Sequence, residues 1–149
     1  MNLLFTLFGM AALDADCHTR EVVGPLVVIK GTGGSADTIY KGSIVCFAPS
    51  GYVNVYTRVT DWVPIGVAKK QVTVAGSNAE SIEIITGKIW IAHSSAAQTN
   101  VGMLAYGVND NAITVSSTVG LTPCGRVLQY KSGYLLIDFN DKAPTRSTV

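Results

Sequence analysis

The sequence carries little charge, and its basic residues are scattered. Only 14% of the 149 residues are charged, against about 25% in an average soluble domain. Eleven Lys and Arg nearly balance ten Asp and Glu, so the formal net charge is +1, and no basic run is present. A protein that binds nucleic acid concentrates positive charge to displace counterions from phosphate. The sequence therefore predicts no nucleic-acid partner.

Cysteine is also scarce, with three copies at Cys17, Cys46 and Cys124. An odd number without a Cys-x-x-Cys pair argues against both a disulfide framework and a zinc site. Free, mostly buried thiols are the expected state for a protein made in a reducing cytoplasm. We expect no metal ion and no cofactor.

Long hydrophobic runs are missing as well. The longest apolar stretch, "MNLLFTLFGMAAL" at the N-terminus, is too short and too interrupted for a membrane span. It lacks the Lys or Arg that precedes the apolar part of a signal peptide, and Asp14 and Asp16 stand where small residues should precede cleavage. We therefore expect no membrane partner and interpret this stretch as an apolar arm that is buried against a partner.

The common catalytic signatures, such as Gly-x-Ser-x-Gly and His-Glu-x-x-His, do not occur. The loop "KGTGGS" at residues 30–35 lacks the Gly-Lys-Ser/Thr and the following helix that bind phosphate. Cys17 and His18 are adjacent, and adjacent side chains on an extended segment point apart. His93 follows an apolar run and is expected to face solvent or a neighbouring subunit. These observations predict a protein that is not an enzyme.

Short apolar runs separated by Gly, Asn and Ser make up most of the chain, and no window shows a convincing helical stripe with caps. The stretch "YVNVYTRV", Tyr52–Val59, alternates with the period of two that is typical of a half-buried strand. This alternation predicts that the valines at 53, 55 and 59 point inward and that Tyr52, Asn54, Tyr56 and Arg58 point outward. The stretch "SIEIITGKIWIA" is expected to form two strands about a turn at Thr86–Gly87.

A longer pattern occurs twice. Gly42 begins "GSIVCF" and Gly66 lies in "PIGVA", whereas Gly102 begins "GMLAY" and Gly125 lies in "PCGRV". The two glycine pairs have nearly equal spacing, and each encloses a turn and a strand. A glycine that opens a strand permits the bulge or bend that a barrel corner requires. The pattern predicts an all-β fold, a small β-barrel or sandwich built from two similar four-strand units.

Composition divides the chain into three regions. We expect an apolar N-terminal arm at residues 1–24, a β domain at residues 25–140 and a polar C-terminal tail at residues 141–149. The tail contains a proline and is expected to be loosely held.

Residues 41–139 resemble the small capsid decoration, or cement, proteins of tailed bacteriophages. The resemblance rests on the order "KGSIVCF", "PIGVA", "ESIEIITGKIWIAHSS", "VGMLAYGVNDNAITV" and "PCGRVLQYKSGYLLIDF", in which Cys124 and Arg126 replace commoner small residues. It implies a β-barrel-like virion protein, often a homotrimer, on the capsid exterior after synthesis in the host cytoplasm. The implied partners are the major capsid protein and further copies of this chain. The implied function is to cement neighbouring capsid proteins.

Two groups of residues are candidates for this contact. Tyr and Arg are enriched at interface hot spots, and apolar side chains on an arm need a partner to cover them. The candidate interface residues are Leu3, Leu4, Phe5, Leu7, Phe8, Tyr52, Tyr56 and Arg58. Two alternatives stay open: another virion β-module, such as a head fibre base or tail component, or a carbohydrate-binding β-sandwich. For the latter, Trp62 and Trp90 could line a sugar site, although a lone Trp is more often used for core or interface packing.

Overall fold

The computed structural model describes residues 12–18, 20–35, 37–75, 80–116 and 121–143. In these ranges the chain forms β-strands joined by turns, with one short 3-10 helix, η1 (Gln98–Asn100). The strands are β1 (Glu21–Thr32), β2 (Asp37–Ile39), β3 (Ile44–Phe47), β4 (Val53–Val55), β5 (Val63–Ala68), β6 (Val72–Val74), β7 (Ser81–Ala92), β8 (Leu104–Gly107), β9 (Ile113–Thr114), β10 (Gly125–Lys131) and β11 (Tyr134–Asp138). The predicted all-β class is confirmed.

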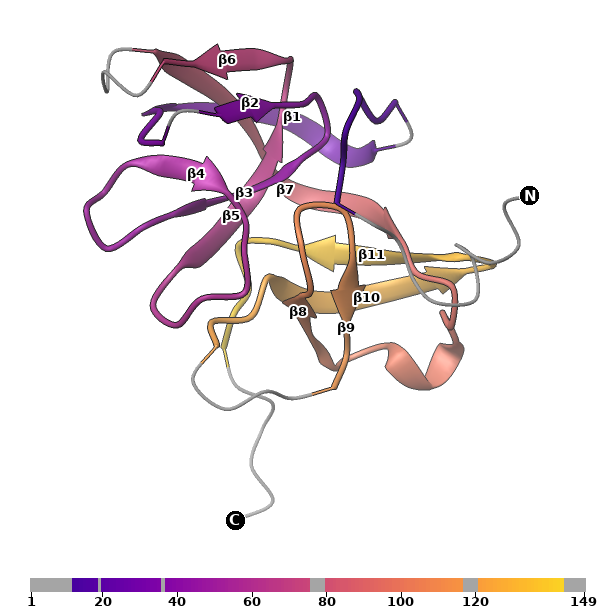
Figure 1. The fold of residues 1–149 in the computed structure, drawn as a ribbon. Helices are drawn as coiled ribbons and strands as arrows, with labels where there is room; N and C mark the ends of the chain where they lie inside the picture. Colours follow the sequence, from indigo (N-terminus) through magenta and orange to yellow (C-terminus); the bar gives the residue numbers. More distant parts are fainter. Residues whose placement is uncertain (1–11, 19, 36, 76–79, 117–120, 144–149) are drawn as a thin grey trace.

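The strands are organised in two sheets. In the described part of the chain, nine strands form one sheet with the order β4-β3-β5-β7-β11-β10-β8-β9, and β1 pairs with β7. The ribbon of β2 and β6 forms the second sheet and lies at the end of the molecule that contains β3, β4 and β5 (Figure 1). A bridge between Gly33 and Val53 draws the chain after β1 toward β4, so this half of the large sheet curls into a half-barrel. These features agree with the predicted barrel or sandwich.

The strand order reads the same from both ends, which confirms the predicted repeat. In each half a hairpin (β3–β4 or β8–β9) places its first strand beside a third strand (β5 or β10), and that strand pairs with a fourth (β7 or β11). The glycines occupy matching positions. A Cβ on Gly66 would lie 2.1 Å from the carbonyl oxygen of Ile85, and a Cβ on Gly125 would lie 2.0 Å from that of Asp138. Each glycine therefore allows the fourth strand to approach the third.

Strand β7 corrects one prediction, because it runs unbroken through Thr86–Gly87, where a turn was expected. Gly87, with φ of 106°, bends the strand without reversing it. Both edges of β7 are occupied, by β1 on one side and by β5 and then β11 on the other. These neighbours supply the backbone hydrogen bonds that a hairpin would otherwise have made. A continuous strand therefore satisfies the backbone better than a local turn.

The core consists of two clusters of buried side chains. The larger lies among β3, β7, β8, β10 and β11 and includes Ile44, Ile89, Leu135 and Phe139. The smaller fills the space between the half-barrel and the β2–β6 ribbon. Its buried members are Ile39, Val45, Val53, Ala68, Val74, Ile82 and Ile84.

The predicted faces of Tyr52–Val59 are wrong at Asn54, Tyr56 and Val59. Tyr56 is only 1% exposed and belongs to the larger core, whereas Val59 is 42% exposed. For Tyr56 and Val59 the reason is that β4 ends at Val55, so the period-two alternation stops there. Asn54 is also buried, and its Oδ1 accepts a hydrogen bond from the Ser35 N–H at 2.9 Å.

The N-terminal segment is fastened to the domain well before residue 25. The Leu13 N–H donates to Asp110 Oδ1 at 2.9 Å, and the Cys17 N–H donates to the Lys41 carbonyl at 2.8 Å. Strand β1 begins at Glu21 and crosses the expected boundary at residue 24. The division into arm, domain and tail stays a prediction. Among the described residues, no helix has the length and apolar character needed to span a membrane.

Candidate functional site

The structure separates the residues that were expected to form one contact surface. Tyr56 points into the core, Tyr52 is half-buried and Arg58 is exposed. Tyr56 therefore contributes no side chain to the surface, and the outward orientation predicted for it is wrong. The five arm residues Leu3, Leu4, Phe5, Leu7 and Phe8 lie outside the described residues. The role of this set at an interface stays a prediction.

Among the described strands, β1 carries the most exposed apolar side chains. It pairs with β7 along one edge, and its other edge has no strand partner within the described ranges. Three of its side chains are largely open to solvent: Val23 at 39%, Leu26 at 57% and Val27 at 47%. The other edge strands of both sheets are only two or three residues long. A long, apolar sheet edge is a template for contact with another chain.

A bulge shapes this edge. The pairing of β1 with β7 shifts between Val23 and Val27, and Gly24, with φ of 87°, and Pro25 lie in the shifted part. Proline lacks an N–H and a bulge interrupts the ladder, so a partner strand cannot pair along the whole edge. Leu26 projects at this point and is the most exposed large apolar side chain in the described chain. The edge therefore favours contact through side chains over strand addition.

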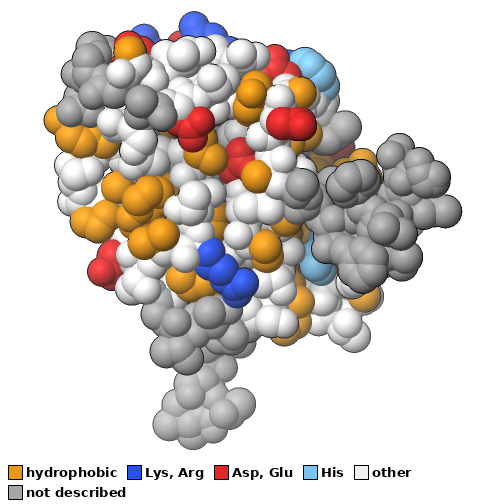
Figure 2. Space-filling model, viewed as in Figure 1, with side chains coloured by type: hydrophobic (Ala, Val, Ile, Leu, Met, Phe, Trp, Pro, Cys, Tyr) orange, Lys and Arg blue, Asp and Glu red, His pale blue; other side chains and the backbone are white. Residues whose placement is uncertain are grey.

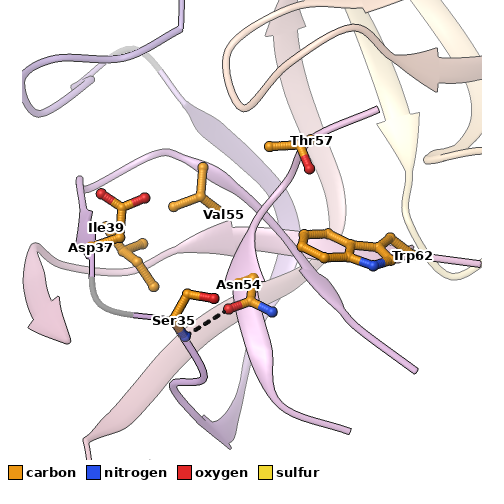
Figure 3. Close-up of a pocket in the computed structure, with 7 residues that line it drawn as sticks. All are labelled: Ser35, Asp37, Ile39, Asn54, Val55, Thr57 and Trp62. Atoms are coloured by element: carbon orange, nitrogen blue, oxygen red, sulfur yellow. Dashed lines mark hydrogen bonds between the residues drawn. The ribbon is translucent and has the colours of Figure 1, made fainter. Parts of the chain in front are cut away.

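A second feature is a pocket of about 160 Å³ between β2 and β4 (Figure 3). Its lining residues are Ser35, Asp37, Ile39, Asn54, Val55, Thr57 and Trp62. On the face shown in Figure 2, charged side chains are sparse, and apolar ones gather over β3, β4 and the loop before β5. Trp62 comes from that loop and packs in part against the larger core, which fixes the position of its ring.

The polar groups of the pocket have unused hydrogen-bonding capacity. The Ser35 N–H occupies Asn54 Oδ1, and the Thr38 N–H occupies one oxygen of Asp37 at 2.8 Å. Within the described residues, Asn54 Nδ2 and the second Asp37 oxygen make no hydrogen bond to protein, and the hydroxyls of Ser35 and Thr57 donate none. No polar side-chain atom among them is buried without a partner, so these groups are open to solvent.

Sequence reasoning singled out Trp62 and placed Asn54 outward, but it did not identify Ser35, Asp37 or Thr57. These residues meet only because the β2–β6 ribbon lies against the half-barrel, and no local pattern signals that contact. The other tryptophan, Trp90, does not line this pocket. Trp90 is 8% exposed, and Lys131 Nζ lies 4.3 Å above its ring centre.

A buried polar cluster lies around Asp110. Its carboxylate accepts hydrogen bonds from the Leu13 N–H and the Ser43 hydroxyl, both at 2.9 Å. Burial raises the pKa of Asp110, while these hydrogen bonds and the charge of Arg20 oppose the rise. The guanidinium of Arg20 donates to the Gly42 carbonyl at 3.0 Å and to Asn111 at 2.8 Å. Because the carboxylate is 3% exposed, this cluster fastens the N-terminal segment and offers no surface for a substrate.

Two cysteines and His93 are the remaining candidates for reactive groups. Burial raises the pKa of both the Cys46 and the Cys124 thiol to about 12, so neither is a nucleophile at neutral pH. His93 follows β7, is half-buried and has a pKa lowered by burial. Among the described residues, no group of three or more His, Cys, Asp or Glu side chains could hold a metal ion.

Comparison with known proteins gives a likeness to solved structures but none to a described family. No protein-family model matches this chain, and no curated protein matches it. One similar solved structure is the N base of the head fibre protein gp8.5 of bacteriophage phi29. The TM-score is 0.46 at 10% sequence identity, and the match covers 75% of this chain and 93% of that chain.

Proposed function

We propose that this chain is a structural virion protein of a tailed bacteriophage that binds the outer surface of the capsid and cements neighbouring major capsid proteins. It acts by contact alone, as a homotrimer, without catalysis, cofactor, nucleic acid or membrane. The decoration-protein resemblance of residues 41–139 supports this class, and the trimer is taken from that resemblance.

The observation that carries the proposal is the exposed apolar edge of β1. Val23, Leu26 and Val27 gather at a bulge on a chain whose surface has few charges. Covering such side chains with a partner removes apolar area from water, at about 25 cal/mol per Å². The bulge directs Leu26 outward, so this side chain is expected to insert between side chains of a capsid protein.

The test is to follow the chain on purified particles of the phage that encodes it. We expect it to co-sediment with full heads at a copy number comparable to that of the major capsid protein. Leu26→Asp should lower its occupancy on heads, because a carboxylate at the contact would be desolvated without a partner. The isolated variant should unfold at the same urea concentration as the parent, since Leu26 is mostly exposed.

Val108→Asp is the matched control, because Val108 is 39% exposed but lies in the β8–β9 turn. It should leave occupancy unchanged. A chain that localises to the tail or to a single vertex, or an L26D variant with full occupancy, would overturn the proposed mode of binding.

A further inference from the structure

We propose that the pocket between β2 and β4 binds one ring of a neutral sugar. This inference does not depend on the proposed capsid function, since it rests only on the residues that line the pocket. Figure 3 shows the indole of Trp62 on one side of the pocket and the carboxylate of Asp37 on the other, with Asn54 and Val55 on β4 between them.

The pocket combines an apolar surface with a polar rim, which is what a sugar ring requires. Trp62 offers a flat aromatic face, and Ile39 and Val55 add apolar surface beside it. A pyranose carries C–H groups on its ring face and hydroxyls around its edge. The C–H face would pack on the indole, while the hydroxyls would reach the rim.

The rim supplies both kinds of hydrogen-bonding partner. The open oxygen of Asp37 can only accept, whereas Asn54 Nδ2 can only donate, and the hydroxyls of Ser35 and Thr57 can do both. A sugar hydroxyl also donates and accepts, so neighbouring hydroxyls can pair with Asp37 and Asn54 at the same time. Most other neutral ligands of this size lack several adjacent groups with both capacities.

The charge of the site selects among sugars. Asp37 is the only charged residue among the seven that line the pocket. An anionic sugar would therefore meet an unbalanced carboxylate and be disfavoured. A metal ion is also disfavoured, because a calcium site takes six to eight oxygen ligands and usually several carboxylates. Neutral hexoses and N-acetylhexosamines are the ligand class that fits.

Two key side chains are held in place before any ligand arrives. The hydrogen bond from the Ser35 N–H orients the Asn54 amide so that Nδ2 is the free end. Trp62 is half-buried against the larger core and cannot rotate freely. Such preorganisation lowers the entropy lost on binding. Because one ring makes few contacts in a shallow site, we expect a Kd on the order of 1 mM.

The test is a titration of the full chain, labelled with ¹⁵N, with glucose, galactose, mannose and N-acetylglucosamine. At least one sugar should shift the indole N–H signal of Trp62 and the side-chain amide signals of Asn54 in a saturable way. The indole N–H of Trp90 is an internal control, because Trp90 is buried and covered by Lys131. Sialic acid, which is anionic, should bind more weakly than the best neutral sugar.

Variants assign the binding to the pocket. Asp37→Asn and Thr57→Ala change exposed side chains and should fold normally, yet each should weaken binding at least about fivefold. Trp62→Phe keeps an aromatic ring against the core and should weaken binding less than Trp62→Ala. Tyr130→Ala, at an exposed aromatic outside the pocket, should have no effect. The proposal is overturned if no neutral sugar shifts the Trp62 indole signal even at sugar concentrations well above about 1 mM. It is also overturned if D37N and T57A bind the sugar as tightly as the parent does.

Discussion

Tyr56 provides the sharpest test of the packing, because its burial reverses the role that the sequence pattern indicates. The ring is 1% exposed, and its hydroxyl donates to the Gly107 carbonyl over a long 3.5 Å contact. Truncation of a buried aromatic residue to Ala costs about 3–5 kcal/mol. We therefore expect Tyr56→Ala to lower the free energy of unfolding by this amount. An exposed interface tyrosine would leave it almost unchanged.

Removing only the hydroxyl should have a small effect. The hydrogen bond to Gly107 is at the limit of normal length, so Tyr56→Phe should cost no more than about 1 kcal/mol. Tyr52→Ala is the matched control, since Tyr52 directly precedes β4 and is only half-buried, and it should cost less than Tyr56→Ala. Urea denaturation followed by circular dichroism measures all three values.

Gly107 makes the test specific to this contact. A Cβ at Gly107 would lie 2.2 Å from the Tyr56 ring, so Gly107→Ala forces the ring to move and should cost about 1–3 kcal/mol or more. When the ring is already absent, the added methyl enters the vacated space, and the same change should cost much less. A double-mutant cycle should give a coupling energy of at least about 1 kcal/mol. The same cost for Gly107→Ala in both backgrounds would refute the described packing. Tyr56→Leu serves as the background if Tyr56→Ala does not fold.

Further predictions concern the buried ionisable groups. Because burial raises the folded-state pKa of Cys46 and Cys124 from 9.0, and of Tyr56 from 10.0, to about 12, the folded state holds protons that the unfolded chain releases. The urea midpoint should therefore fall as the pH rises from about 9 toward 12; a midpoint that stays flat over that range would contradict this prediction. Asp110→Asn should cost at most about 1 kcal/mol at neutral pH, since the raised pKa of Asp110 shows that its charge is disfavoured, whereas Asp110→Ala should cost about 2–3 kcal/mol by removing a buried acceptor. Equal urea-unfolding losses for the two variants would disagree with this. In the native protein, Cys17 should react with a thiol reagent in a colorimetric assay well before the two buried cysteines; equal rates would mean that the core opens readily.

The repeat could be predicted from sequence because it depends on residues with a local requirement. Gly66 and Gly125 are each demanded by the close approach of one neighbouring strand, and such a demand appears at the same place in both units. The face of Tyr56 could not be predicted in this way. Its orientation depends on where β4 ends and on the space left by Gly107, which is far away in the chain. The pocket could not be predicted from the sequence for the same reason, since Ser35 and Asn54 meet only in the assembled fold.

The central position of β7 has a consequence for how the chain is made. Its neighbours come from the beginning of the chain (β1), from just before it (β5) and from near its end (β11). During synthesis, the isoleucines of β7 therefore stay without their full cover until β11 has left the ribosome. Strands that wait unpaired are prone to aggregation. A chain truncated before Tyr134 should therefore accumulate as insoluble material, because folding requires β11 to be complete.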